Sequence, residues 1–370
     1  MRYIDEYRNK EIAQKILRQI KTVSKRKISL MEVCGTHTVA IFRNGIRKML
    51  PSNINLISGP GCPVCVTPIS YIDEIIALSR GENFIITTFG DMMRVPGSTS
   101  TLEKEKADGA DIRIVYSTLD ALKIAQDNSF KEVVFMGVGF ETTSPTIASA
   151  ILKAKKEKVN NFSVLSVAKI MPPVMKALLE GKEVNIDGFI CPGHVSVIIG
   201  SQPYIFITTQ YKIPCVICGF EPLDILHSIY MLVKQIEDER AEVEIQYERA
   251  VKPEGNKIAL DKINEVFKVV DSDWRGIGNI FLSGLEIKDK YRQYNARKFE
   301  VEIEETKEPK GCRCGDILRG VIIPPECSLF RKVCTPENPQ GACMVSTEGT
   351  CAAYYKYNLV GADLVSARKS

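Results

Sequence analysis

Residues 54–78 read INLISGPGCPVCVTPISYIDEIIAL: a short apolar run, a turn rich in Gly and Pro, and a helical pattern of apolar residues. This order is typical of a strand and helix in an α/β protein. Comparable apolar runs recur along the chain, at 28–33, 84–89, 112–117, 132–138, 162–167, 186–190 and 214–218. Continuous apolar strands separated by helices predict parallel sheets that are buried on both faces.

The order of these strands predicts the domain organisation. The strands fall into two sets along the chain, so we expect two similar parallel-sheet α/β domains. The first spans 1–127 and includes an amphipathic helix over 5–25; the second spans 128–240. The polar stretch that follows contains strand-like segments at 242–249 and 298–305 and leads into a cysteine-rich tail. We therefore expect a third, smaller cysteine-rich domain over 241–370.

Composition narrows the class of protein. The chain has 370 residues and a net charge of +4, without a basic stripe that would bind nucleic acid. No apolar run reaches the roughly 18 residues needed to cross a membrane, and the charged N-terminal segment does not resemble a secretory signal. We expect a cytoplasmic protein, in which thiols stay reduced and cysteines serve as metal ligands or redox groups.

The segment 311–351 carries six of the twelve cysteines. These are Cys312, Cys314, Cys327, Cys334, Cys343 and Cys351. Zinc ribbons usually contain two tight Cys-x₂₋₄-Cys knuckles, which this segment lacks, and the chain has only three histidines. Six thiols in a loop-rich stretch favour a [4Fe–4S] cluster. Spacing alone leaves open which four bind, and zinc remains an alternative.

Two Cys-x-x-Cys segments have different surroundings. Cys62 and Cys65 lie between a strand and a helix, where the helix dipole lowers the pKa of a thiol, so we interpret them as a redox dithiol. Half of a zinc site, or an inert pair, is the alternative. Cys215 and Cys218 fall within an apolar strand, where positions three apart point to opposite faces. We expect that pair to be buried and inert.

Cys34 ends the first predicted strand and precedes a small residue, Gly35, that leaves room for a ligand. Thr36 and His37 follow it as polar contacts. Such a cysteine can be a nucleophile, a single-thiolate metal ligand or a structural residue. Because ligands of parallel sheets bind beyond the carboxyl ends of strands, we expect the unusual residues to converge on one edge of each sheet.

Several blocks, taken in order, resemble the HypD family of [NiFe]-hydrogenase maturation factors over nearly the whole chain. The blocks are MEVCGTHT (31–38), GPGCPVCVTP (59–68), TFGDMMRVPGS (88–98), GFETTSPT (139–146), CPGHVSVIIG (191–200), CGFEPLDIL (218–226) and CMVSTEGTCAAYYKY (343–357). The family often has a second histidine shortly after the one at His37, whereas here Val39 and Ala40 follow Thr38. Any role of that second histidine is absent from this chain.

The resemblance implies a scaffold that assembles the Fe(CN)₂CO unit together with the chaperone HypC and the cyanide donor HypE. The hydrogenase large subunit would receive the unit through HypC. Cys34 would hold the iron jointly with the N-terminal cysteine of HypC, His37 would lie beside it, and Cys62 and Cys65 would form the redox dithiol.

The tail also fits the family pattern C-x₁₄-C-x₆-C-x₁₆-C. On that pattern the [4Fe–4S] ligands would be Cys312, Cys327, Cys334 and Cys351. Cys314 or Cys343 could replace a neighbour. We interpret the protein as a redox-active assembly scaffold rather than a conventional turnover enzyme.

Two other functions remain open from the residues. A cluster-dependent protein disulfide reductase explains the tail and the pair Cys62 and Cys65, but gives Cys34 no role. A structural zinc-binding interaction protein explains the tail alone. A disulfide reductase should keep its activity when Cys34 is substituted, whereas a scaffold should not. An iron–sulfur protein is brown, whereas a zinc protein is colourless.

Overall fold

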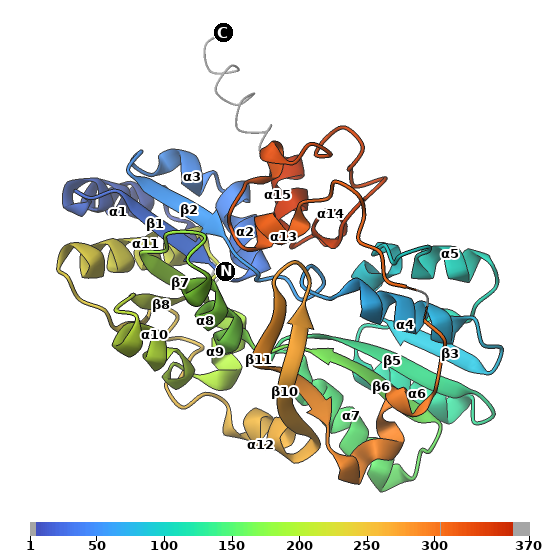
Figure 1. The fold of residues 1–370 in the computed structure, drawn as a ribbon. Helices are drawn as coiled ribbons and strands as arrows, with labels where there is room; N and C mark the ends of the chain where they lie inside the picture. The colour runs from blue at the N-terminus through green and yellow to red at the C-terminus, as the bar shows by residue number, and fades with distance from the viewer. Residues whose placement is uncertain (1–4, 304, 358–370) are drawn as a thin grey trace.

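The computed structural model describes residues 5–303 and 305–357. The protein has an α/β fold with two parallel sheets, flanking helices and a cysteine-rich C-terminal region (Figure 1). This confirms the predicted fold class. Among the described residues, no helix is both long enough and apolar enough to span a membrane.

The first sheet has five parallel strands in the order β2-β1-β7-β8-β9. Its strands are β1 (Ile28–Glu32), β2 (Ile54–Ser58), β7 (Gly188–Pro192), β8 (Cys215–Cys218) and β9 (Val243–Ile245). The central strand β1 is held between β2 and β7, with Leu30 opposite both Leu56 and Gly188. The side chain of Leu30 is fully buried, as a strand covered on both faces requires.

The second sheet has four parallel strands in the order β4-β3-β5-β6. They are β3 (Phe84–Thr88), β4 (Ile112–Ile114), β5 (Glu132–Gly139) and β6 (Phe162–Ala168). Seven of the eight residues of β5 are buried, which agrees with its position inside the sheet. All eight apolar runs identified in the sequence therefore contain strands.

The predicted grouping of these strands is wrong. The strands expected at 84–89 and 112–117 were assigned to a first domain with 28–33 and 54–58, but they pair with β5 instead. The chain leaves the first sheet after β2, builds the whole second sheet, and returns at β7. A boundary between residues 127 and 128 therefore falls within the second sheet. Apolar strands reveal burial but not which distant strand they pair with.

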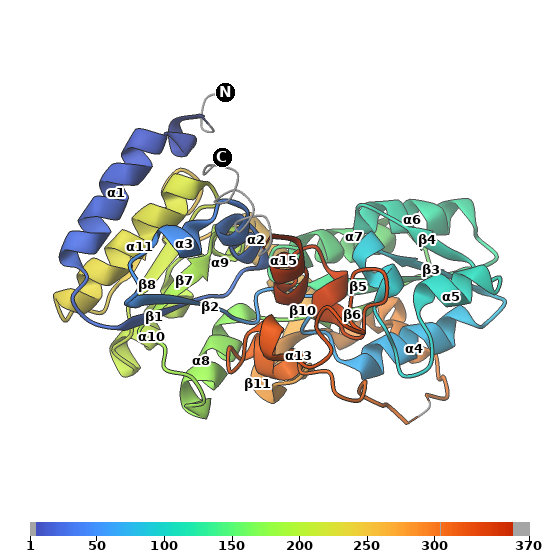
Figure 2. The same ribbon diagram turned by 90° about the horizontal axis from the view of Figure 1, so that it is seen from above.

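Helices cover the sheets and connect the strands. They are α1 (Lys10–Val23), α2 (Gly35–Arg43), α3 (Ile46–Met49), α4 (Ile69–Ser79), α5 (Leu102–Ala107), α6 (Thr118–Asp127), α7 (Ser144–Glu157), α8 (Met171–Gly181), α9 (Gly193–Ile199), α10 (Ile205–Gln210), α11 (Pro222–Glu237), α12 (Lys257–Val266), α13 (Cys314–Leu318), α14 (Ala342–Val345) and α15 (Thr350–Tyr357). Short 3-10 helices lie at Asp5–Arg8, Gly90–Arg94, Gln202–Tyr204, Asp289–Tyr294, Ala296–Lys298 and Pro324–Glu326. Figure 2 shows α1 and α11 side by side on the outer side of the first sheet, so the predicted amphipathic helix over 5–25 is confirmed.

An antiparallel hairpin, β10 (Phe267–Trp274) and β11 (Gly278–Ile287), packs beside the second sheet. The N–H of Ile170 donates to the carbonyl of Ser283 at 2.9 Å and joins the hairpin to the end of β6. We did not predict this hairpin, because its strands mix apolar residues with charged and polar ones and many of its residues are exposed. The strand expected at 298–305 is wrong for its described residues, which lie outside any strand.

The cysteine-rich C-terminal region lies between the two sheets in both ribbon views (Figures 1 and 2). On one side the ring of Tyr354 packs against Phe42 of α2, with centroids 4.3 Å apart. On the other side Arg94, which follows β3, donates to the carbonyl of Pro336 at 2.9 Å. The region therefore contacts the strand ends of both sheets, where the sequence predicted the site residues.

Candidate functional site

Cys34 lies at the carboxyl end of β1, immediately before α2, and its side chain is buried. Its N–H donates to the carboxylate of Glu32 at 3.2 Å. The turn after β2 packs directly against it: a Cβ added at Gly61 would lie 2.1 Å from the backbone nitrogen of Cys34. Only glycine fits at that position. The close approach brings the turn that carries Cys62 next to the turn that carries Cys34.

Burial determines the protonation of Cys34. Desolvation, followed by the charge of Glu348, raises the pKa of the thiol to about 12, while the backbone N–H groups of His37 and Thr36 act in the opposite direction. The thiol is therefore protonated at neutral pH. A soft metal ion that displaced this proton would gain a thiolate ligand in a dry site.

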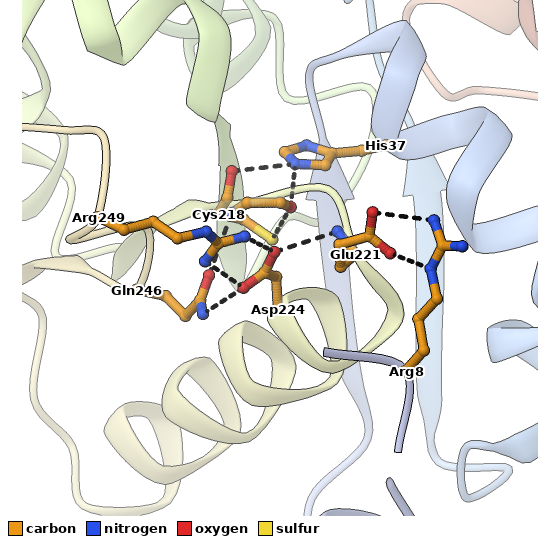
Figure 3. Close-up of polar contacts among 8 residues, drawn as sticks. Arg8, His37, Cys218, Glu221, Asp224, Gln246 and Arg249 are labelled. Atoms are coloured by element: carbon orange, nitrogen blue, oxygen red, sulfur yellow. Dashed lines mark hydrogen bonds and ion pairs between the residues drawn. The ribbon is translucent and has the colours of Figure 1, made fainter. Parts of the chain in front are cut away.

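His37 is fully buried and has a defined tautomer. Its Nε2 lies 3.2 Å from the carbonyl of Cys218 and 3.0 Å from that of Gly219, so Nε2 carries the proton (Figure 3). Nδ1 has no hydrogen-bond partner among the described residues, which leaves its lone pair free. Desolvation lowers the pKa of His37 to about 4, so the ring is neutral. Phe220 stacks on it with centroids 4.8 Å apart.

An ionic network centred on the buried Asp224 supports the segment after β8, whose carbonyl groups contact His37. Asp224 accepts hydrogen bonds from Arg249 at 2.5 Å and from Gln246 at 2.8 Å, and from the N–H of Glu221 at 3.1 Å (Figure 3). Arg8 extends the network by donating to the carboxylate of Glu221 at 2.7 Å. These positioning residues were not predicted: Glu221 and Asp224 lie in the block CGFEPLDIL (218–226), but no sequence pattern links them to Arg8, Gln246 or Arg249.

Glu348 connects the C-terminal region to Cys34 and was also missed. Its carboxylate accepts a hydrogen bond from the hydroxyl of Thr36 at 2.7 Å. Its Cβ would lie 2.5 Å from a Cβ added at Gly35, so that glycine is required for the contact. The carboxylate also opposes the desolvation that lowers the pKa of His194. Glu348 lies in the block CMVSTEGTCAAYYKY (343–357), three residues before Cys351, but the block alone does not give it a role.

The pair Cys62 and Cys65 lies in a turn, and both thiols are buried. The N–H of Cys65 is 3.3 Å from Sγ of Cys62, so the two side chains are adjacent. The expected effect of the helix dipole is wrong for Cys65, because α4 begins only at Ile69. Burial raises the pKa of the Cys65 thiol above its ordinary value. The adjacency nevertheless suits a dithiol.

Five cysteines of the C-terminal region line one small cavity: Cys312, Cys314, Cys327, Cys334 and Cys351. The remaining lining residues are apolar or glycine: Ile317, Leu329, Phe330, Gly341 and Met344. Gly341 is packed so closely that an added Cβ would lie 2.8 Å from Sγ of Cys312 and 2.9 Å from Sγ of Cys314. The cavity thus brings the four predicted ligands together, with Cys314 as a fifth.

The donor set of this cavity, several thiols among apolar side chains, is compatible with a soft-metal cofactor such as an iron–sulfur cluster. Among the described residues, no three His, Cys, Asp or Glu side chains converge tightly enough to bind one metal ion. A tetrahedral zinc site needs four donors at about 2.3 Å from one ion. In a [4Fe–4S] cluster each thiolate binds a different iron, so the ligands surround a wider space. The N–H of Gln340 donates to Sγ of Cys334 at 3.4 Å, a kind of contact that tunes cluster potentials.

Cys343 links the cavity to the turn of Cys62. It does not line the cavity, and its side chain is fully buried. Hydrogen bonds from the thiols of Cys314 and Cys65 lower its pKa to about 6. Contacts between thiols therefore run from Cys62 through Cys65, Cys343 and Cys314 to Cys312. We call these five cysteines the thiol chain. The family pattern leaves Cys314 and Cys343 outside the predicted ligand set, as possible replacements for a neighbour.

Cys215 and Cys218 are both buried in β8, as predicted. Cys215 packs in the same core as Cys191, whereas Cys218 packs in the core beneath α11, on the other face of the sheet. The Sγ of Cys218 donates to the carbonyl of Gly219 at 2.9 Å. The two thiols cannot meet, so they form no dithiol with each other.

A groove of about 670 Å³ opens on the surface beside the Cys34 turn. Its walls are α1, α2 and the start of α11, and its lining includes Thr36 and Phe220. Thr36 follows Cys34 by two residues, and Phe220 stacks on both His37 and His194. The groove therefore leads to the immediate surroundings of the buried Cys34.

Comparisons with known proteins show the family of the chain. Residues 10–358 match the model of the HypD family, described as "Hydrogenase formation hypA family". The chain is 47% identical over 368 residues to the hydrogenase maturation factor HypD2 of Bradyrhizobium diazoefficiens, covering 96% of this chain and 97% of that protein. It is 46% identical over 368 residues to the hydrogenase maturation factor HypD of Cupriavidus necator, with the same coverage.

An archaeal relative is equally similar. The putative hydrogenase expression/formation protein of Methanocaldococcus jannaschii is 48% identical over 336 residues, covering 90% of this chain and 93% of that protein. A family match over nearly the whole chain, with relatives far above 30% identity, decides the family. The chain belongs to the HypD family of hydrogenase maturation factors.

Proposed function

We propose that the protein is a cytoplasmic scaffold on which the Fe(CN)₂CO unit of [NiFe]-hydrogenases is assembled, with iron held by Cys34. The observation that carries this proposal is a buried thiol, Cys34, three residues before a buried neutral histidine whose Nδ1 has no partner among the described residues. Low-spin iron with cyanide and CO ligands prefers a soft thiolate in a dry pocket. Cys34 offers such a thiolate once its proton is displaced.

A second thiolate would come from the N-terminal cysteine of HypC. The groove between α1, α2 and α11 is the surface that HypC would occupy, because it ends at Thr36 and Phe220 beside the Cys34 turn. Its charged lining residues are Arg8, Lys10, Arg43 and Glu221. Two thiolates from two proteins hold the iron only while the complex persists, so separation of the partners releases it toward the hydrogenase large subunit.

The thiol chain would supply electrons for cyanide transfer. HypE would present cyanide as a thiocyanate-like group, and R–S–CN plus two electrons gives R–S⁻ plus CN⁻, which binds the iron. Oxidation of the Cys62 and Cys65 thiols to a disulfide releases two electrons and two protons. This electron balance requires a two-electron donor beside the iron site. The pair Cys62 and Cys65 is suitably placed, because its turn packs through Gly61 against the turn with Cys34.

The C-terminal cavity would hold the resident cofactor. Cys312, Cys327, Cys334 and Cys351 would ligate a [4Fe–4S] cluster, with Cys314 facing the same cavity. The cluster supplies single electrons when bound. Cys314 also contacts Cys343, which contacts Cys65, so the protein's own thiols connect the cavity to the dithiol.

Infrared spectroscopy tests this function. The protein is purified anaerobically with HypC and examined in the region where metal-bound cyanide and CO absorb. We expect paired cyanide bands and a CO band that are lost in Cys34→Ala and retained in Cys215→Ala, which removes a buried thiol of β8. A brown, cluster-containing complex without such bands would instead support the cluster-dependent disulfide reductase.

A further inference from the structure

A cavity of about 180 Å³ lies beside residues 166–168, the carboxyl end of β6, where the β10–β11 hairpin packs on the second sheet. Its polar lining comes from three separate parts of the chain. Tyr71 belongs to α4, Ser272 to β10, and Asn295 and Arg297 to the segment after the hairpin. Ligands of open parallel sheets bind beyond the carboxyl ends of strands, in cavities with a few convergent polar groups. The proposed function uses no residue of this cavity.

Lys169 supplies a buried positive charge behind the cavity. It directly follows β6 and is 1% exposed. Its Nζ donates to the hydroxyl of Ser272, which lines the cavity, and to the carbonyl of Asp273 at 2.7 Å. Burial lowers the pKa of Lys169 to about 8, so most of the amine is still charged at neutral pH. Because the oxygen of Ser272 accepts from an ammonium group, the hydroxyl can give its own hydrogen to a ligand.

Arg297 adds a second cation and acts on Tyr71 in the same way. Its guanidinium donates a hydrogen bond to the hydroxyl of Tyr71, so that hydroxyl also keeps its own hydrogen for a ligand. The centroid of the Tyr71 ring lies 5.3 Å from Cζ of Arg297 and 5.2 Å from Nζ of Lys169. The ion pair of Arg297 with Glu74 is long, at 3.8 Å, which leaves guanidinium N–H groups for a ligand. The cavity thus combines a guanidinium with two hydroxyl donors that cations polarise.

Two carboxylates also line the cavity, and each has a partner. Asp271 accepts a hydrogen bond from the N–H of Leu282 at 2.9 Å, and Glu286 forms an ion pair with Lys268 at 3.2 Å. These two carboxylates would repel a ligand with two negative charges about twice as strongly as a ligand with one. The charges of the lining therefore favour a small ligand with a single negative charge.

We propose that this cavity binds a small carboxylate, held by the guanidinium of Arg297 and by the hydroxyls of Tyr71 and Ser272. A guanidinium and a carboxylate are both planar and pair through two parallel hydrogen bonds. The volume suits a carboxylate of the size of acetate or propionate. A bound carboxylate would join α4 to the hairpin. This site is separate from the proposed function and does not depend on iron held by Cys34.

Saturation-transfer NMR with acetate tests the site in the full, anaerobically purified chain. A titration gives the dissociation constant of acetate, and three competitors are then added at the same concentration as acetate. Propionate carries the same charged group and should displace acetate. Acetamide has the shape of acetate without its charge, and sulfate carries two charges, so neither should displace it.

Variants of the lining locate the bound acetate. Arg297→Gln and Tyr71→Phe should each raise its dissociation constant about tenfold, because each removes a donor to the carboxylate. Arg292→Gln removes an exposed charge from the same segment and should leave the constant unchanged. Thermal melting shows whether each variant folds, and Tyr71→Phe, which keeps the ring, decides the test if Arg297→Gln does not fold.

The proposal would be overturned if acetate did not bind, or if acetamide or sulfate displaced it as well as propionate does. It would also be overturned if Arg292→Gln weakened binding as much as the two lining variants, or if folded lining variants bound acetate unchanged. The measurement requires neither HypC nor the iron unit, so each of these outcomes leaves the scaffold function intact.

Discussion

Two Cys-x-x-Cys segments of this chain have the same spacing and opposite surroundings. Cys62 and Cys65 lie in the turn after β2, where their thiols are adjacent and that of Cys65 reaches Cys343. Cys215 and Cys218 lie within β8, where the extended backbone sends their thiols to different cores. Spacing alone therefore does not make a dithiol; the backbone conformation of the four residues does.

The largest expected difference between the two segments is functional. In the complex with HypC, Cys62→Ser or Cys65→Ser should abolish the infrared bands of the iron unit, because one remaining thiol cannot store two electrons. Cys215→Ser should retain them. Assembly that survives loss of either Cys62 or Cys65 would contradict the role of the thiol chain, even if Cys34→Ala still removed the bands.

The next test substitutes Gly341 in the cysteine cavity and measures how closely the thiols must pack. Gly341→Ala would place a Cβ within 2.9 Å of Sγ of Cys312 and of Cys314. Overpacking of this kind costs about 1–3 kcal/mol, which weakens cofactor retention by roughly 5- to 150-fold. Iron content and visible absorbance after anaerobic gel filtration measure the loss.

Gly181→Ala is the matched control for this change. Nothing lies within 4 Å of a Cβ added at Gly181, near the end of α8. Its iron content should equal that of the unchanged protein. Retention of full iron content by Gly341→Ala would mean that the thiols of Cys312 and Cys314 move freely, contrary to a preformed cavity.

Much of this site could be predicted from the sequence, because turns at strand ends are recognisable as Gly-containing segments after apolar runs. The runs that contain β1, β2 and β8 are apolar, and each is followed by a glycine-containing turn, so Cys34, His37 and Cys62 could be placed on one sheet edge. The pairing of β1 with β7 could not, since these strands are more than 150 residues apart in the chain and apolar runs do not specify partners.

The residues that sequence reasoning missed act through tertiary contacts. Glu348 belongs to the Cys34 site only because the C-terminal region folds back onto α2. In the sequence, Asp224 and Arg249 look like any other charged residues. The fold of β8, α11 and the segment after β9 brings them together beneath His37. Cys343 became informative only from its position between Cys65 and Cys314. No local pattern encodes such long-range neighbours.

Glu141 is a buried carboxyl group at a strand end that has no role in the proposed function. It follows β5, and desolvation raises its pKa to about 7. Between pH 4.5 and 7 the folded state binds more protons than the unfolded state, so the contribution of Glu141 to stability decreases as pH rises through this range. The full loss is about 3 kcal/mol.

Glu141→Gln removes this pH dependence. Relative to the unchanged protein, the variant should gain up to about 3 kcal/mol of unfolding free energy between pH 4.5 and 8. Urea unfolding at the two pH values measures the difference. The same substitution at the exposed Glu254 should have no such effect. An equal difference at both pH values would show that the pKa of Glu141 is the same in the folded and unfolded states.

The smallest expected effect is that of substituting the buried cysteines of β8, Cys215 and Cys218. Cys215→Ala removes one buried sulfur from a packed core and should cost about 1–2 kcal/mol, seen as a lower melting temperature with unchanged infrared bands. Cys218→Ala removes in addition the S–H donor to the carbonyl of Gly219, which His37 also contacts. Its bands should therefore shift in frequency even where they persist. Identical bands in both variants would mean that the carbonyl of Gly219 keeps its position beside His37 without the thiol of Cys218.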